Sequence, residues 1–247
     1  MKKVVLMIAL ALCSTVAFAQ KVNKAEMKQM QAFLAQPAEK DATNAQALKI
    51  ANVNDPSTWE GVTVENGRIV EIKWRDKKLA GSLNLSGFQA LRSVDVSRNR
   101  LTGVTVAGDP ALTTLNASRN RLATIDMANC PQLTDVSVNN NRLTDITLQN
   151  IPVLKNLNVS NNLFAQLDLS SSATLQTLNC QGCHLETLNV DNCTALKNLY
   201  AGYNKLTQLT FSGVTNLTNL NIDDNNITNM IVSGLPALST FVCSDNN

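Results

Sequence analysis

A leucine recurs every 21 residues through most of this 247-residue chain. The recurring residues are Leu91, Leu112, Leu133, Leu154, Leu175, Leu196, Leu217 and Leu238. Each begins the pattern L-x-x-L-x-L-x-x-N-x-L-x-x-L-x-L, as in LTDVSVNNNRLTDITL from Leu133 to Leu148, and repeat positions are numbered from this leucine. A period held without a gap predicts stacked units that share one continuous core.

Positions four and six alternate with polar neighbours, as expected of a short strand with one buried face. Stacking these strands predicts a parallel sheet. Position nine holds Asn99, Asn120, Asn141, Asn162, Cys183, Asn204, Asn225 and Asn246. Because an Asn side chain both donates and accepts hydrogen bonds, we expect this row to satisfy backbone groups at the turn and not to bind a ligand.

The repeats are preceded by an N-terminal cap. Residues 20–68 form the cap region, 69–90 a degenerate first repeat of 22 residues, 91–237 seven full repeats and 238–247 a partial one. In the first repeat, Trp74 falls at core position six and Lys77 at position nine. Apolar residues between Lys24 and Leu34 have helical spacing, which predicts a short helix covering the open end of the core.

Residues 1–19 have the features of a cleaved secretory signal. Lys2 and Lys3 precede a short apolar run that ends in Ala17-Phe18-Ala19, so we expect cleavage after Ala19. No later segment reaches about 18 uninterrupted apolar residues. The sequence therefore predicts a secreted, cell-surface or periplasmic protein without a membrane span.

Five cysteines follow the signal: Cys130, Cys180, Cys183, Cys193 and Cys243. Cys130 and Cys193 occupy position nineteen, an apolar position where a small buried side chain fits. Cys180 and Cys183 form a C-x-x-C motif, but they fall at positions six and nine of one repeat and no second ligand pair accompanies them. The alternative is a redox or metal role for this motif, which the C-x-x-C spacing alone does not establish.

An enzyme would have to use the single histidine, His184, beside Cys183. Adjacent side chains leave a strand in opposite directions, which disfavours a nucleophile and base pair. We expect no enzyme activity, no catalytic residues, no metal and no cofactor.

The segments that lead into the repeats resemble those of a known group of proteins. WEGVTV from Trp59, NGRIVEI from Asn66 and LAGSL from Leu79, together with the repeats, resemble the secreted or surface leucine-rich repeat proteins of Bacteroidetes bacteria and, more distantly, internalins. The resemblance implies an α/β leucine-rich repeat solenoid, a β-rich right-handed superhelix or horseshoe with a parallel concave sheet, that binds other macromolecules. The 21-residue repeat departs from internalins.

Candidate ligand-binding residues stand out at positions that should face solvent. Side chains at positions three and five should project from the concave face, and most of them are small polar groups or amides. Arginines cluster at positions eight and ten, as Arg98, Arg100, Arg119, Arg121 and Arg142. Stacked arginines suit a carboxylate-rich or sulfated partner, and a solvated flank is the alternative.

Tyr200 and Tyr203 fall in one repeat, followed by Asp223 and Asp224 in the next. The tyrosines offer an aromatic contact for a protein side chain or a sugar ring, with ordinary surface tyrosines as the alternative.

Charge is segregated along the chain. Residues 68–142 carry 11 basic and 6 acidic residues, whereas 143–247 carry 3 basic and 7 acidic ones. We expect a non-catalytic recognition module that binds a protein or glycan on its concave face, with no nucleic-acid partner. The alternative is a self-associating solenoid: the sequence ends ten residues into a repeat, so the last strand is expected to offer an uncapped edge to a second copy.

Overall fold

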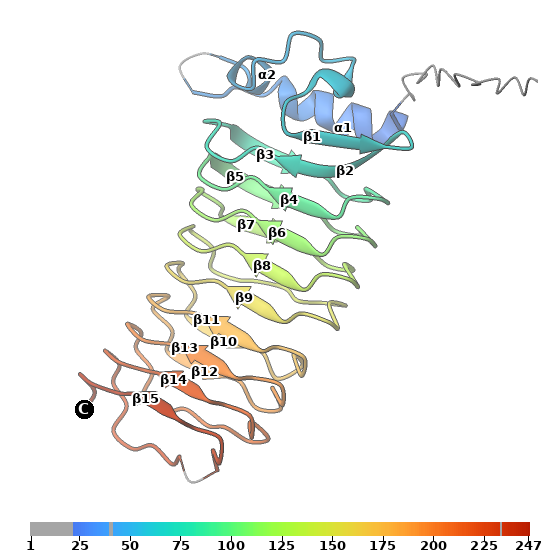
Figure 1. The fold of residues 1–247 in the computed structure, drawn as a ribbon. Helices are drawn as coiled ribbons and strands as arrows, with labels where there is room; N and C mark the ends of the chain where they lie inside the picture. The colour runs from blue at the N-terminus through green and yellow to red at the C-terminus, as the bar shows by residue number, and fades with distance from the viewer. Residues whose placement is uncertain (1–21, 40–41, 233) are drawn as a thin grey trace, which may run out of the picture.

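The computed structural model describes residues 22–39, 42–232 and 234–247, and the predicted signal of residues 1–19 lies outside them. The described chain is an elongated stack of rungs closed at one end by helices (Figure 1). One ten-stranded sheet runs through it in the order β1-β2-β4-β6-β8-β9-β11-β13-β14-β15. The predicted leucine-rich repeat solenoid is confirmed.

The rung strands follow the sequence period. They are β4 (Ser93–Asp95), β6 (Thr114–Asn116), β8 (Asp135–Ser137), β9 (Asn156–Asn158), β11 (Thr177–Asn179), β13 (Asn198–Tyr200), β14 (Asn219–Asn221) and β15 (Thr240–Val242). Neighbouring strands pair in parallel with equivalent residues opposite one another, as Thr114 with Asp135. The first repeat pairs Glu71 with Ser93, at an offset of 22 residues.

The cap begins with α1 (Lys24–Leu34), as predicted, and Asn23 accepts hydrogen bonds from its first turn. Phe33 stacks on Trp74 with ring centroids 5.9 Å apart. The buried Glu26 accepts from Ile69 N at 3.0 Å and pairs with Arg68 at 2.9 Å. These contacts join the helix to the first repeat and cover the core end, which is how a solenoid cap acts.

Other cap elements were not predicted. α2 (Asn44–Ala47) and the short helix η1 (Pro56–Thr58) follow α1, and β1 (Val62–Glu65) pairs antiparallel with β2 (Arg68–Lys73). The Asn44 side chain donates to Ala80 O at 2.9 Å and accepts from Ala80 N at 3.1 Å. Asn44 thereby continues the strand bonding of the return side into the cap.

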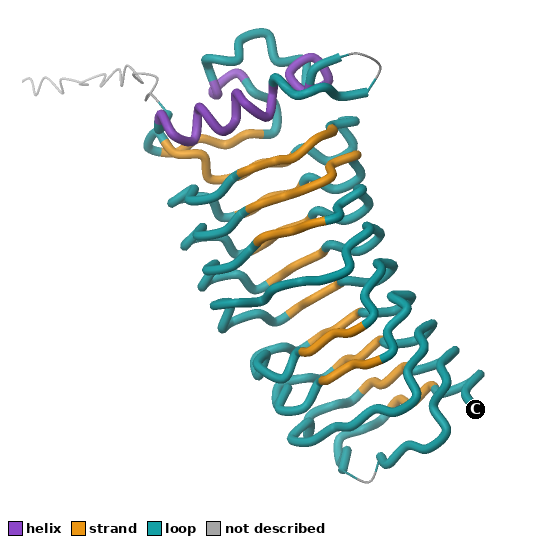
Figure 2. The backbone as a smooth tube through the Cα atoms, turned by 180° about the vertical axis from the view of Figure 1, so that it is seen from behind, coloured by secondary structure: helices purple, strands orange, loops and turns teal. Residues whose placement is uncertain are grey.

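The return side of each rung is extended, which the sequence analysis also did not predict. β3 (Ala80–Asn84), β5 (Arg100–Thr105) and β7 (Thr124–Asp126) form one small parallel sheet, and β10 (Gln166–Asp168) and β12 (Thr187–Asn189) form another (Figure 2). The two small sheets are separated at the repeat in which Asp145 Oδ1 accepts a hydrogen bond from Ile146 N at 2.8 Å. A side chain that takes a neighbouring backbone N–H competes with strand pairing.

The asparagine row is structural, as predicted. Asn162 is 2% exposed, and its Nδ2 donates to Val159 O at 2.8 Å and Val138 O at 3.0 Å. Its Oδ1 accepts from Leu143 N at 3.0 Å, so one side chain satisfies three backbone groups on two rungs. The same contacts recur along the row, for example at Asn120 and Asn225.

Cys183 interrupts this row. Its Sγ donates to Val159 O at 3.1 Å, which replaces one of the asparagine contacts. Among the bonds of the described residues, the N–H of the buried Phe164, which an Asn at position nine would reach, has no acceptor. One rung is therefore joined to its neighbour by fewer hydrogen bonds than the others.

Position nineteen is buried, as predicted for Cys130 and Cys193. Each thiol donates to a backbone carbonyl, Cys130 to Val106 O at 3.1 Å and Cys193 to Leu169 O at 3.2 Å. The first full repeat holds the fully buried Asp109 at this position. Asp109 Oδ1 accepts from Phe88 N at 2.7 Å, while Oδ2 has no partner in the described chain. Burial therefore raises the pKa of Asp109 to about 8.

None of the helices in the described ranges is long and apolar enough to cross a bilayer.

Candidate ligand-binding surfaces

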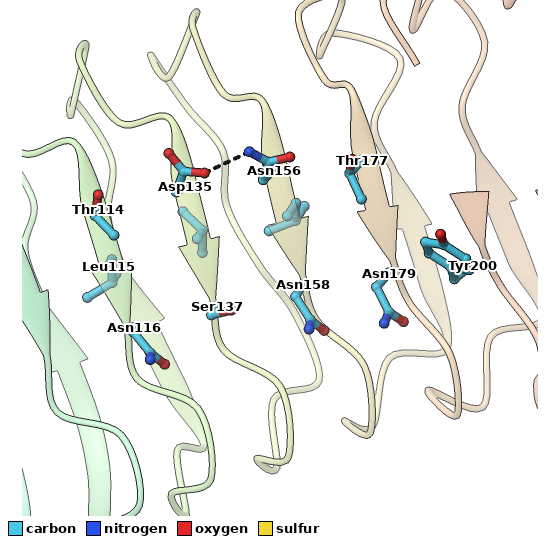
Figure 3. A pocket seen from close by; sticks show the side chains of 12 residues that line it. Thr114, Leu115, Asn116, Asp135, Ser137, Asn156, Asn158, Thr177, Asn179 and Tyr200 are labelled. Atoms are coloured by element: carbon cyan, nitrogen blue, oxygen red, sulfur yellow. Dashed lines mark hydrogen bonds between the residues drawn. The ribbon is translucent and has the colours of Figure 1, made fainter. Parts of the chain in front are cut away.

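A shallow hollow of about 360 Å³ lies on the ten-stranded sheet across rungs β6 to β13. Its polar lining comes from positions three and five and ends at Tyr200 (Figure 3). The side chains at position three bond to one another across rungs, as Asn156 Nδ2 does to Asp135 Oδ1 at 2.7 Å. This row therefore holds a fixed arrangement before any ligand arrives.

Position five behaves differently. Asn116, Asn158 and Asn179 each accept a hydrogen bond at Oδ1 from the backbone N–H two residues later, at 3.2, 3.1 and 3.1 Å. This local turn fixes which end of each amide faces the backbone. Their Nδ2 groups donate to none of the residues that the structure describes, so they form a row of free donors along the hollow. These asparagines were not among the predicted ligand-binding residues, although the spacing Asn-x-Ser at 116–118 and 158–160 is typical of such turns.

Tyr200 lies at the C-terminal end of this hollow, and Tyr203 follows it three residues later. Tyr200 ends β13 and is 39% exposed, and Tyr203 is 54% exposed on the turn that follows. Tyr203 N donates to Asp223 O at 2.9 Å, so Asp223 and Asp224 lie one rung away. Their negative charges raise the pKa of the Tyr203 hydroxyl. The structure therefore brings the predicted tyrosines and aspartates into one aromatic and acidic patch.

Gly202 makes room within this patch. A Cβ at Gly202 would collide with Asp223 Oδ1 and would stand 2.9 Å from Asn221 Oδ1. Asp223 Oδ1 is buried and has no hydrogen-bond donor among the described groups.

The five predicted arginines lie elsewhere, in the first three full repeats. Arg98 and Arg119 occupy the turn after the rung strand, with left-handed φ angles of 57° and 55°. Arg121 and Arg142 are exposed two residues further along their turns, at position ten. Arg100 pairs with Glu39 of the cap at 3.0 Å, so part of its charge is already compensated. Arginines and tyrosines are therefore two separate surfaces.

The Cys183 and His184 pair does not form a catalytic arrangement. Cys183 is fully buried and burial raises its pKa to about 11, whereas His184 is exposed on a left-handed turn with φ 66°. A buried thiol with a raised pKa is a poor nucleophile. Cys180 is also buried, and its pKa is raised well above the ordinary value.

The period, the parallel sheet and the asparagine row together define a leucine-rich repeat fold. Comparison with protein families agrees: a model described as "Leucine Rich repeats (2 copies)" matches residues 110–150, and one described as "Leucine Rich Repeat" matches residues 216–238. No curated protein sequence matches the chain.

Solved structures place the chain among internalin-like neighbours. The functional domain of InlJ from Listeria monocytogenes, described as including a cysteine ladder, is 26% identical over 72% of this chain and 42% of that one, with a TM-score of 0.60. Two further structures share the fold at 20% identity. The leucine-rich repeat domain of LRIM1 covers 68% of this chain and 56% of its own, with a TM-score of 0.60.

The third is the Arabidopsis receptor kinase HAESA, in complex with the peptide hormone IDA and the co-receptor SERK1. The match covers 91% of this chain and 42% of the HAESA chain, with a TM-score of 0.59. The chain thus spans between 42% and 56% of the length of these three structures.

Proposed function

We propose that this protein is an exported, non-catalytic recognition module that binds a protein ligand across its concave face. The observation that carries the proposal is the row of free amide donors at Asn116, Asn158 and Asn179 beside Tyr200. A polypeptide offers backbone carbonyl oxygens, which accept such hydrogen bonds, and Tyr200 offers an apolar face for a side chain. HAESA, a neighbour in fold, is described in complex with a peptide hormone.

A glycan is the second ligand class for the same hollow. Hydroxyl and ring oxygens accept hydrogen bonds from amides, and sugar rings stack on tyrosine. The site does not by itself separate the two classes, so both belong in the binding screen.

The experiment is a binding screen of residues 20–247 against host and bacterial surface proteins and glycans. Each hit is then measured with Asn158→Asp plus Asn179→Asp. Aspartate keeps the acceptor of the local turn, as Asp95 does for Ser97 N at 3.0 Å, but lacks the free N–H₂ donors. We expect the affinity to fall about tenfold, from two lost hydrogen bonds.

A matched control makes the same change away from the concave sheet. Asn52→Asp plus Asn84→Asp alters two asparagines that accept the same local bond, at 3.0 and 2.9 Å. We expect this variant to bind like the unmodified protein. Equal losses in both variants, or none in the first, would show that the concave amides do not bind the ligand.

Pairing of two copies through the C-terminal edge is the second candidate function. Phe241 and Val242 of β15 are 41% and 39% exposed, and no described strand pairs with the outer edge of β15. Edge strands of this kind associate with other edges. Light scattering over a concentration series would show dimers that Val242→Lys removes, and a monomer at every concentration contradicts the idea.

A further inference from the structure

Four arginines form two rows along the edge of the solenoid where the rung strands end. We call Arg98, Arg119, Arg121 and Arg142 the arginine edge. Arg98 N and Arg119 N donate to carbonyls of the following rung, at 2.9 and 2.8 Å, and Arg121 N and Arg142 N donate to the preceding rung, both at 2.9 Å. These bonds hold equivalent residues in register, one rung apart, at a strand spacing of about 4.8 Å.

The charge of this edge is not compensated by any ion pair among the residues that the structure describes. Arg68, Arg92 and Arg100 pair with glutamates of the cap region, at distances between 2.6 and 3.0 Å. None of the four edge arginines has an ion pair in the described ranges, and neither does Arg75 one rung earlier. Asp76 lies one rung before Arg98 in the same row, and Asp95, Asp126 and Asp145 are near the edge in sequence, but none of these carboxylates is within ion-pair distance of the four arginines.

Folding does not explain why arginine stands at these positions. Like charges directly opposite one another on neighbouring strands are unfavourable. The left-handed turn adds a backbone cost for Arg98 and Arg119, which glycine and asparagine largely avoid. Later rungs hold Asn140, Asn161 and Gly182 in the same left-handed conformation. A costly residue kept where a cheaper one fits is a reason to look for a ligand.

We propose that the arginine edge binds a linear sulfated polysaccharide that runs along the solenoid axis. The planar guanidinium group binds sulfate and carboxylate in a bidentate manner, and a row of arginines offers one such group at each rung. A sugar ring is about as long as one rung is high, and alternate rings of a linear chain present their anionic groups on the same face. These groups therefore recur at about the height of two rungs and can reach arginines that lie two rungs apart. The site is separate from the concave hollow and does not depend on the function proposed above.

Two other polyanions fit this edge less well. The exposed aromatic side chains Tyr200 and Tyr203 lie several rungs away, so the edge offers no stacking surface for the bases of a single-stranded nucleic acid. An extended acidic peptide repeats its side chains on one face about every 6.6 Å, which does not match the rung spacing. Asp224 and Asp245 occupy the same row near the C-terminus and would repel any polyanion there, which confines binding to the first rungs.

The test measures binding of fluorescently labelled heparin oligosaccharide to residues 20–247 by anisotropy at several salt concentrations. The edge variant carries Arg98→Asn, Arg119→Asn, Arg121→Gln and Arg142→Gln. We expect its affinity to be at least about tenfold lower and its dependence on salt to be weaker, because fewer counterions are released. The control variant removes four exposed positive charges elsewhere: Lys24→Gln, Lys28→Gln, Lys155→Gln and Lys197→Gln.

The control should change heparin affinity by less than about twofold. Equal losses in both variants, or no heparin binding by the unmodified protein at low salt, would overturn the proposal. So would equally tight binding of polyglutamate or single-stranded DNA, since charge density alone would then explain it. Thermal unfolding should show the edge variant to be at least as stable as the unmodified protein, and a loss of stability would contradict the argument that these arginines are costly.

The concave-face proposal can fail separately. Asn158→Asp plus Asn179→Asp should leave heparin binding unchanged, because these residues lie on the sheet and not on the arginine edge.

Discussion

Replacing Cys183 by asparagine should stabilise the protein. Cys183 stands where the neighbouring repeats have Asn162 and Asn204, and an asparagine at 183 should adopt the same contacts. It would give the N–H of Phe164 an acceptor, as Asn162 does for Leu143 N at 3.0 Å. It would also donate to the carbonyl three residues earlier, as Asn162 does to Val159 O at 2.8 Å.

The magnitude follows from the two added hydrogen bonds. Each net hydrogen bond contributes about 1 kcal/mol, and a buried N–H without an acceptor carries a cost of about 1 to 3 kcal/mol that the substitution removes. The thiol contact with Val159 O is replaced by an amide contact of the kind that Asn162 makes with Val138 O at 3.0 Å. We expect the free energy of unfolding to rise by about 2 kcal/mol.

Urea denaturation followed by circular dichroism measures this difference. The matched control is Cys180→Asn, the same substitution at core position six of the same repeat, where the amide would be buried without the row's partners. We expect the control to lose about 2 kcal/mol or more. If Cys183→Asn left the stability unchanged or lowered it, the account of position nine as a hydrogen-bonding position would be wrong.

Three further outcomes are expected. Between about pH 4 and about pH 8 the folded protein keeps a proton on Asp109 that the unfolded chain releases. The free energy of unfolding should therefore fall as pH rises through this range, by at most about 1.4 kcal/mol per pH unit, and should level off above about pH 8. Asp109→Asn should flatten this dependence in urea titrations at pH 5, 7 and 9, and an unchanged slope would refute the assignment. A maleimide should label Cys243, which is exposed, much faster than the four buried cysteines of the folded protein, and mass spectrometry showing equal labelling would contradict the burial. Gly202→Ala should move Asp223 and lower the melting temperature. Gly234→Ala is the control, because Gly234 also lacks a left-handed φ and an added Cβ there meets no atom within 4 Å, so it reports the substitution without a collision.

The repeat period predicted most of the architecture, because each rung has the same buried positions and must place them against the next rung. Helix α1 was predictable because its apolar residues have one spacing and Pro37 follows it. The return-side strands were not, since their pairing depends on local competition such as that of Asp145 with the N–H of Ile146. The same apolar spacing precedes and follows this break.

The candidate surfaces were partly predictable. The repeat pattern places Arg98 and Arg119 at position eight and Arg121 at position ten, and these side chains are exposed, as is Tyr200. Whether they bind a ligand stays a prediction. The ion pair that occupies Arg100 joins residues 61 positions apart, and no repeat pattern contains Glu39. The free donors of the concave asparagines depend on which end of each amide the turn holds, which is a property of backbone geometry.

The left-handed turn at position eight has a practical consequence. Eight successive rungs place arginine, asparagine, glycine, tyrosine or aspartate on one repeated backbone conformation, and the side chain that leaves it is not part of the core. Substitutions there leave the packing of the leucines unchanged, and their effects on one another come only from contacts and charges between neighbouring rungs. The chain thus provides a scaffold on which chosen side chains can be displayed in a line at intervals of about 4.8 Å.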